Sequence, residues 1–483
     1  MAELCVVYLS EDEPIVEQLV RLLRRHWDVW WARDISQGDW EEAVRAEIPK
    51  SRALVPVLSR HAKGERTTIL KDEMQLARTQ RKKIFPFLIG PAEIPLGFGS
   101  LNRTEAYNWS GNERDLGYQQ LRAKIAENIG NGRNTSATLE RFKELTVREK
   151  VLRLPAFAFS LSSHETQVSP NEGTTLLRLL QPGAVLVSAY DAWKCTSRDK
   201  VFKSNIKSLR ESEAVLFLDS GNYEAYRKND RHSPKKNPRG WNRHHFRETV
   251  AHLPPDLAFS FDTIAPIGNP DQIVAKTVAN FRADDKALLE RDFPLCPIIH
   301  LPKEYVGPLA ECAAQIVTGV ATELDPLMLA IPERELGDGL RDRVKTVRNI
   351  RKALNVLGKY HPLHLLGTGN PLSMIALAAA GADSFDGLEW CRTVADYPTG
   401  YLFHFQQFEC FSQAFSDRVK DPSVKHLIAN PDAPYAMRTL SYNVDFFKDW
   451  TRTMQDMIHA GQVEYLLKMV PNIGQTLFKD ISE

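Results

Sequence analysis

Short apolar runs alternate with amphipathic stretches along the first 130 residues. Segments such as 13–26 and 40–48 show the apolar spacing of helices. The runs between them have the length of buried parallel strands, and they are CVVYL at 5–9, WDVWWA at 27–32, ALVPVLS at 53–59, IFPFLIG at 84–90 and EAYNW at 105–109. Five strands alternating with helices predict an α/β fold, a small flavodoxin-like doubly wound parallel sheet.

A change of composition follows this region and divides the chain. The segment IGNGRNTSATLE at 129–140 is polar and contains glycine, which indicates a linker. The next segment, RFKELTVREKVLRL at 141–154, predicts a connector helix. The expected organisation is therefore a first domain at 1–130, a linker with connector helix at 131–150, and a second domain at 151–483.

The second domain repeats an apolar run followed by a helix-compatible stretch such as 338–358. The candidate strands are 184–190, 214–220, 257–262, 296–302, 326–332, 362–369, 382–390 and 401–405. Eight such units predict a (β/α)8 TIM barrel, with an open parallel sheet as the alternative. The tail at 439–470 predicts an amphipathic helix packed on the barrel.

Aspartates stand beside several of these runs. They are Asp219 in LFLDSGNYE, Asp262 in LAFSFD, and Asp383 and Asp386 in GADSFDGLEWCR. Because α/β folds carry their chemistry just past the carboxyl ends of strands, these segments predict one acidic pocket. Such a pocket suits a positively charged group, or one that becomes positive during a reaction.

Composition narrows the class of protein. The chain has 483 residues, 43% of them hydrophobic and 25% charged, as in soluble globular proteins. Its net charge of +1 means that any nucleic-acid contact must come from a local patch. The six cysteines are scattered without a CxxC pair, which favours a reducing compartment and no zinc site. No apolar run reaches the roughly 18 residues of a membrane span, and no signal peptide is evident, so a cytoplasmic location is expected.

The first domain carries motifs in the order and spacing of one family. They are the S-x-D turn after the first run, an R-D-I-x-x-G-x-W loop and the acidic helix LKDEMQLA, which contain Ser10, Asp12, Arg33, Asp34, Gly38, Trp40 and Glu73. Residues 1–130 thereby resemble a TIR domain. Many TIR domains cleave NAD at the nicotinamide–ribose bond and self-associate, so the resemblance implies NAD as substrate and a partner copy of the chain.

The resemblance also assigns site residues. Glu73 matches the carboxylate that lies beside the ribose, where it would stabilise an oxocarbenium-like sugar. The W-x-x-E pattern common in the family is replaced by TILKDE, which makes Asp72 a neighbouring candidate. The expected NAD-binding residues are Ser10, Arg33, Asp34, Trp40 and Asp72. Two alternatives remain, that Glu73 is a solvated charge on a helix, or that the TIR domain is only an adhesion module.

The second domain carries another set of motifs, LDSGNYE, FSFD, HLLGTGNP and GADSFDGLEWCR. From about 150 to 475 it resembles the tRNA-guanine transglycosylase family, including the relatives that act on DNA. That family is a (β/α)8 barrel that exchanges a purine in a nucleic acid for a deazapurine such as queuine or archaeosine. The resemblance implies tRNA or DNA as a partner.

Base exchange needs a nucleophile on one face of the sugar and an acid for the departing purine. By motif position Asp386 is the nucleophile and Asp219 the general acid/base. The expected substrate- and base-binding residues are Asp262, Glu333, Gly367, Gly369, Asp383 and Arg392. The alternative for each aspartate is a strand-end cap or turn ligand.

The second domain also departs from the family pattern. The family's Cys/His zinc cluster is missing, so no metal is predicted. The glycine-rich loop after the fifth strand is replaced by IPERELGD at 331–338, which brings Pro332, Glu333 and Arg334 into the base-binding area. Asn222 stands where a second glycine is common. These changes suggest a different base or a sensor that no longer exchanges bases.

A basic stretch follows Asp219. Residues 226–248 hold eight Arg or Lys and three His with few acids, which fits an insertion that tracks phosphates and stacks an aromatic ring on a base. The expected nucleic-acid contacts are Arg227, Lys228, Arg231, Lys235, Lys236, Arg239, Trp241 and Arg243. The alternative is a solvated surface loop.

Together these features predict a prokaryotic antiviral defence effector in which the TIR domain consumes NAD and the barrel recognises a nucleic acid or modified base. A base-exchanging transglycosylase that uses the TIR domain for assembly is one alternative. A non-catalytic nucleic-acid-binding scaffold is the other.

Overall fold

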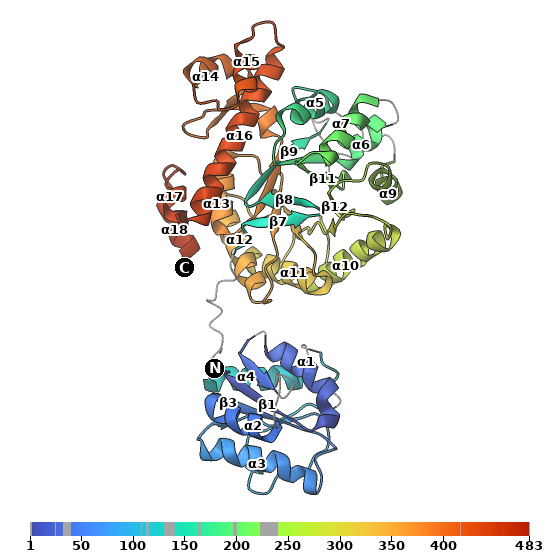
Figure 1. Cartoon of the computed structure of the whole chain (residues 1–483), viewed down its shortest axis with the longest axis vertical. Coiled ribbons are helices and arrows are strands. Elements are labelled where there is room, and N and C mark those ends of the chain that lie inside the picture. The colour runs from blue at the N-terminus through green and yellow to red at the C-terminus, as the bar shows by residue number, and fades with distance from the viewer. Residues whose placement is uncertain are drawn as a thin grey trace. The chain divides into compact units, whose positions relative to one another are not determined.

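In a computed structural model, the structure describes residues 2–24, 26–31, 40–107, 109–112, 115–129, 141–162, 166–196, 200–222, 240–415 and 417–482. The chain forms two compact units, Met1–Glu140 and Arg141–Glu483, and each is described by itself (Figure 1). Within these described ranges no helix has the length and apolar character needed to span a membrane.

The first unit is a parallel sheet in the order β2-β1-β3-β5-β6, with β4 also paired to β3. Its strands are β1 (Leu4–Val7), β2 (Val29–Trp31), β3 (Ala53–Leu58), β4 (Lys83–Ile84), β5 (Phe87–Leu88) and β6 (Thr104–Glu105). The helices are η1 (Ser10–Asp12), α1 (Glu13–Leu23), α2 (Trp40–Glu47), η3 (Ile48–Lys50), α3 (Glu65–Thr79) and α4 (Leu116–Ile129). The predicted doubly wound α/β fold is confirmed.

Burial on both faces of the sheet explains why its strands are continuously apolar. Leu4 and Val6 of β1 belong to one hydrophobic cluster, with residues of α1 and α4. The alternate residues Cys5 and Val7 belong to a second cluster, with residues of α2 and α3. Side chains alternate between the faces of a strand, so both faces must be apolar when helices cover both.

The second unit contains a nearly closed barrel of eight parallel strands (Figure 1). They are β9 (Ala156–Leu161), β10 (Ala184–Ser188), β11 (Val215–Asp219), β12 (Leu257–Phe259), β13 (Leu295–Cys296), β14 (Leu329–Pro332), β15 (Leu363–Leu366) and β16 (Ser384–Gly387). Strand β16 pairs with β9, and a single parallel bridge from Ile298 to Ala330 joins the β13 and β14 segments. The barrel prediction is confirmed, and the open-sheet alternative is wrong.

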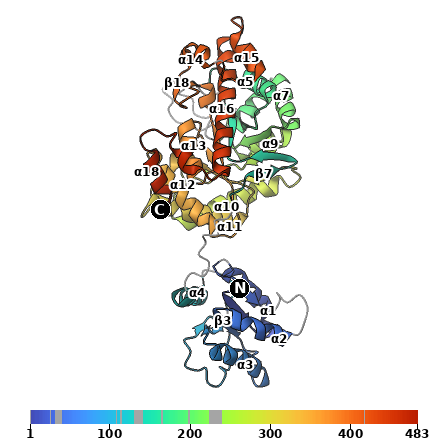
Figure 2. The ribbon, with the colours of Figure 1, turned by 60° about the vertical axis from the view of Figure 1, so that its left-hand side comes forward.

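Helices follow the strands and surround the barrel (Figure 1). They are α5 (Pro170–Leu180), α6 (Ala189–Thr196), α7 (Lys200–Glu211), α9 (Arg243–His252), α10 (Pro270–Ala287), α11 (Leu309–Leu324), η4 (Glu333–Glu335), α12 (Leu340–Asn355), α13 (Pro371–Ala380) and η5 (Glu389–Cys391). The C-terminal part adds η6 (Phe405–Gln407), α14 (Phe408–Phe415), α15 (Pro422–Ala429), α16 (Tyr435–His459), α17 (Val463–Leu467) and α18 (Gly474–Ser482). The long helix α16 packs against the barrel, as expected for the tail (Figure 2).

The predicted strands differ from the observed barrel strands at the first and the last strand of the series. The first barrel strand, β9, was not among the predicted strands. The predicted strand at 401–405 instead forms β18 (Leu402–His404), which pairs antiparallel with β17 (Thr393–Ala395) outside the barrel. Because β9 already occupies the open edge of β16, a later strand cannot enter the barrel, and β18 remains partly exposed.

The predicted connector helix at 141–154 is wrong. This segment is an antiparallel hairpin of β7 (Glu144–Val147) and β8 (Lys150–Arg153). Leu145, Val147, Leu152 and Leu154 follow the period of two residues that defines a strand face. They are buried in one cluster with inner barrel residues such as Ala156. The hairpin therefore fills one end of the barrel interior.

Two fully buried aspartates hold this end of the barrel together. Asp256, just before β12, accepts hydrogen bonds from Lys150 Nζ at 2.6 Å and Arg148 Nη1 at 2.9 Å, both from the hairpin. Asp383, just before β16, accepts from Arg141 Nε at 2.8 Å, Arg351 Nη2 at 2.7 Å and Tyr360 Oη at 2.6 Å. Asp383 thus lies at the amino end of its strand, and its predicted role in base binding is wrong.

We expect Asp383→Asn to lower the free energy of unfolding of the second unit by about 3–5 kcal/mol, since it leaves two arginines facing a neutral partner in a buried site. Urea denaturation followed by circular dichroism measures this change. The matched control is Asp325→Asn, because Asp325 forms an exposed pair with Lys359 that should contribute less than about 1 kcal/mol. Equal effects of the two substitutions would contradict the structural role.

Candidate functional site

Inward-facing positions of the barrel strands become polar toward their carboxyl ends. Along β9 the inward residues change from the apolar Ala156 to the polar Ser160. Along β11 they change from the apolar Val215 to the charged Asp219. These ends enclose an inner pocket of about 310 Å³. Its polar lining comes from most of the strands, namely Ser160, Ser162, Asp219, Ser220, Asp262, His300, Arg334, Asp386, Glu389 and Arg392. The predicted acidic pocket therefore exists, and Asp219, Asp262 and Asp386 all line it.

Asp386 is fixed by contacts from the two strands that flank β16, namely β9 and β15. Its Oδ2 accepts a hydrogen bond from Ser160 Oγ at 2.6 Å, and its Oδ1 accepts one from the Gly367 backbone N–H at 2.9 Å. The fully buried His364 places Nε2 3.3 Å from the same Oδ1. Asp386 is 7% exposed, and these contacts hold its carboxylate in one orientation at the wall of the pocket.

Asp219 ends β11 on another side of the pocket. Its Oδ1 accepts hydrogen bonds from the backbone N–H groups of Gly221 at 2.8 Å and Ala189 at 3.2 Å. The turn that supplies the first of these donors requires glycine, because Gly221 has a φ of 64° and a Cβ there would overlap Tyr190. The sequence LDSGN therefore builds a backbone cradle for this carboxylate.

A buried histidine links two carboxylates beside the pocket. His300 Nε2 lies 2.5 Å from Asp262 Oδ2, and His300 Nδ1 lies 2.7 Å from Glu335 Oε1. Burial by itself would lower the pKa of His300, but hydrogen bonds and charge from the two carboxylates outweigh it and raise the pKa to about 10. Burial would raise the pKa of Asp262, but His300 and Ser220 reverse the effect and lower it. The arrangement is therefore an imidazolium between two carboxylates, and we call it the His300 relay.

Sequence analysis missed His300, Glu335 and Glu389. His300 lies within a predicted strand and Glu335 follows one, much as the chosen aspartates lie within or at the end of predicted strands. This position was the available signal. Glu389 stands three residues after Asp386 and lines the same pocket. Burial raises the pKa of Glu389, more than its own backbone N–H and Arg392 lower it, and the charges of Asp386 and Glu333 add to the rise.

The remaining predicted barrel residues take different positions. Gly367 and Arg392 line the inner pocket, and Gly369 packs against the Glu389 carboxyl group. Glu333 is buried, and its Oε1 accepts a hydrogen bond from Arg343 Nη1 at 2.6 Å. Glu333 therefore contributes charge close to the pocket, although it is absent from the pocket lining.

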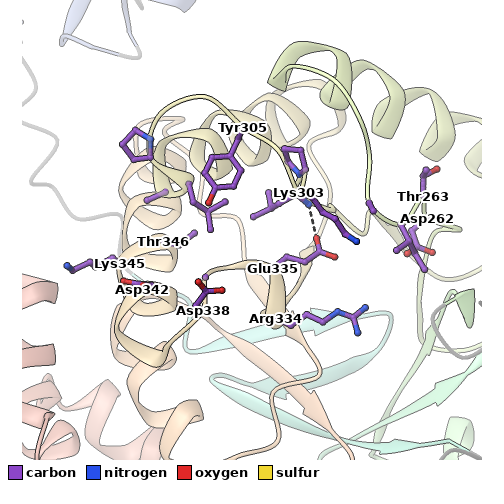
Figure 3. A pocket seen from close by; sticks show the side chains of 18 of the residues that line it. Asp262, Thr263, Lys303, Tyr305, Arg334, Glu335, Asp338, Asp342, Lys345 and Thr346 are labelled. Carbon is purple, nitrogen blue, oxygen red and sulfur yellow. Dashed lines mark hydrogen bonds between the residues drawn. The ribbon is translucent and has the colours of Figure 1, made fainter. Parts of the chain in front are cut away.

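A second, larger cavity of about 1230 Å³ adjoins the inner pocket and shares Asp262 and Arg334 with it. Figure 3 shows Lys303 and Tyr305 on the segment after β13, opposite Asp338 and the α12 residues. The α12 side chains of this lining are Asp342, Lys345 and Thr346. Charges of both signs line this outer cavity, so it offers room for a large polar ligand that reaches into the inner pocket.

The structure describes only part of the basic stretch at 226–248, which was predicted to bind nucleic acid. Arg227, Lys228, Arg231, Lys235, Lys236 and Arg239 lie outside the described residues. Trp241 is fully buried, packs edge-on against Tyr190, and donates its Nε1 hydrogen to the Ser220 carbonyl at 3.2 Å. Arg243 donates to the buried Asp284 at 3.0 Å. The predicted nucleic-acid contact of Trp241 is wrong, because its side chain is part of the barrel core. The Arg243 side chain is 25% exposed, and its nucleic-acid contact stays a prediction.

In the first unit, the loops after β1 and β3 meet at the carboxyl edge of the sheet. Asp12 is buried, and it accepts a hydrogen bond from Ser59 Oγ at 2.7 Å and lies 2.9 Å from His61 Nδ1. The predicted site residue Ser10 is exposed in the same loop. Arg33 and Asp34 lie outside the described residues, as does the side chain of Trp40 at the start of α2.

The two acidic candidates on α3 point in different directions. Glu73 is 7% exposed, on the face of α3 that buries Leu70 and Met74. Asp72 is exposed. Burial of the Cys5 thiol in β1 raises its pKa, and the charge of Glu73 raises it further, which places the carboxylate close to the first strand. Glu73 is therefore the acid directed toward the sheet.

Comparison with known families matches residues 4–122 to the TIR domain. This part of the chain is thus a TIR domain, a family whose members bind NAD, self-associate and in many cases cleave NAD. No curated protein matches the chain. In the part of the chain that the structure describes, no group of His, Cys, Asp or Glu side chains could hold a metal ion.

The His300 relay predicts a pH dependence of stability. The pKa of His300 is about 10 in the folded state and about 6.5 in an unfolded chain, so the folded state binds this proton more tightly. Its stabilisation is complete below about pH 6.5 and is lost as the pH rises through about 10. We expect His300→Gln to remove this alkaline decrease in the free energy of unfolding, measured by urea denaturation between these pH values. The exposed His426→Gln is the control, and an unchanged pH profile in His300→Gln would contradict the relay.

Proposed function

We propose that the chain is a NAD-cleaving effector whose TIR domain uses Glu73. The observation that carries this proposal is the burial of Glu73 against the sheet of a domain that matches the TIR family. In the reaction the bond between C1′ of ribose and the nicotinamide nitrogen breaks, and its electron pair leaves with the nicotinamide. The positive charge passes to the ribose, where a fixed carboxylate stabilises it. Water then attacks C1′ and releases a proton, which gives ADP-ribose.

The barrel is proposed as the recognition module of this effector. Its inner pocket presents three aspartates, a histidine and two arginines in about 310 Å³, a volume that accommodates a single heterocycle with its sugar. Such a pocket favours a nucleic acid or a modified base as the signal. Depletion of NAD in response would halt metabolism in an infected prokaryotic cell, and self-association of TIR domains would assemble the active form.

We expect Glu73→Gln to reduce NAD cleavage about 10²–10³-fold, the usual effect of removing one group that stabilises transition-state charge. Glu127→Gln, an exposed substitution of the same kind on α4 of the same domain, is the matched control and should retain activity. NAD loss and its products are measured by chromatography with and without mixed RNA and DNA. Equal activity of Glu73→Gln and wild type would contradict the proposal, and dependence on nucleic acid would assign sensing to the barrel.

A second candidate function is base exchange by the barrel. It is favoured by the arrangement of Asp386 and Asp219, two carboxylates held on separate strands of one pocket that also contains Glu389. Asp386 would attack C1′ of the target nucleoside, and an acid in the pocket would protonate the departing base. The TIR domain would then serve for assembly.

For this candidate we expect incorporation of labelled guanine or a deazapurine into RNA or DNA, and its loss in Asp386→Asn. Glu73→Gln should leave the incorporation unchanged. Absence of incorporation into every polymer tested would exclude base exchange. If neither NAD nor base chemistry depends on Glu73 or Asp386, salt-sensitive binding to nucleic acid would support the non-catalytic scaffold.

A further inference from the structure

Glu389 is an acidic side chain of the barrel pocket to which neither sequence analysis nor comparison assigned a role. It begins η5, directly after β16, and lines the inner pocket with Asp386 and Asp219. We infer that Glu389 is the proton donor to the departing heterocycle, an inference that rests on the base-exchange candidate.

The fold provides a space that fits the Glu389 carboxyl group. Two glycines, Gly369 and Gly387, lie against its Oε2, and a Cβ added at Gly369 would overlap that oxygen. Oε2 is inaccessible to solvent and has no hydrogen-bond partner among the residues that the structure describes. A polar atom enclosed in this way is costly unless the carboxyl group is neutral.

Burial favours the protonated form of Glu389, and the charges around it act in both directions. Asp386 on β16 and Glu333 on η4 are both acidic, and Arg343 is already bonded to Glu333. Arg392 opposes them, and Arg334 also lines the same pocket. Burial together with the two acidic neighbours leaves the pKa of Glu389 raised.

The neighbouring carboxylates are held by hydrogen-bond donors of the fold. Asp386 accepts hydrogen bonds from the Ser160 hydroxyl and the Gly367 backbone. Asp219 accepts from two backbone N–H groups. Carboxyl groups with such different surroundings in one pocket divide the roles of nucleophile and acid between them. Burial and the enclosed Oε2 distinguish Glu389 in this set and keep a proton available on its carboxyl group.

The reaction balances with these groups alone and an incoming base. An Asp386 oxygen attacks C1′, the C1′–N bond breaks toward the purine, and the Glu389 proton moves to the purine nitrogen. Glu389 is then ionised and Asp386 is esterified to the sugar. An incoming purine or deazapurine gives its N–H proton to Glu389 and attacks C1′, which releases Asp386. The base is exchanged and both side chains return to their starting state.

The test compares two leaving groups in Glu389→Gln. With polymer guanine, which must be protonated to depart, we expect exchange to fall about 10²–10⁴-fold and the decrease of the wild-type rate at alkaline pH to disappear. With polymer 7-methylguanine, which is already cationic, the rate should stay close to wild type. Glu290→Gln, an exposed substitution of the same kind, is the control. An equal loss for both bases would instead indicate a positioning role and would overturn the inference.

A measurement without substrate separates this inference from the function on which it rests. The infrared difference spectrum between wild type and Glu389→Gln at pH 7 should contain the carbonyl band of a protonated carboxyl group. Absence of that band would overturn the assignment of Glu389, whatever the activity. If the band is present but wild type exchanges no base, the base-exchange proposal fails, and the donor role fails with it.

Discussion

The parallel pairing of β16 with β9 is the constraint on which the candidate site depends. It joins the last strand of the nearly closed barrel to the first, so the carboxyl ends of all eight strands lie at one rim. Residues far apart in the chain thereby come into contact, as Ser160 Oγ and Asp386 Oδ2 do at 2.6 Å. The same closure encloses the Glu389 carboxyl group between backbone segments after β15 and β16.

Aspartates at the two ends of the barrel have different hydrogen-bond partners. At the amino ends, Asp256 and Asp383 each bond to two cationic side chains, so their charge is used within the fold. At the carboxyl ends, hydroxyl and backbone N–H groups donate to Asp386 and Asp219. Neutral donors such as these orient a carboxylate without cancelling its charge.

Both proposed activities depend on an oriented carboxylate. Breaking an N-glycosidic bond creates positive charge at C1′, and an oriented carboxylate is the simplest group that stabilises it. Glu73 in the TIR domain and Asp386 in the barrel are both buried beside strands that fix their position. The His300 relay extends the principle, because a charged histidine shared by Asp262 and Glu335 keeps the Asp262 carboxylate ionised and oriented.

The sequence by itself determined the two α/β folds and most of their strands, because apolar runs of strand length are a local property of the chain. It also identified Asp219, Asp262 and Asp386, since strand ends are where such folds carry polar groups. Local pattern could not show that 141–154 fills the barrel end as a hairpin, that Trp241 is core, or that Asp383 binds arginines at the other end. Nor could it find Glu389. These outcomes depend on strand closure and on contacts between residues distant in sequence, which only the tertiary structure decides.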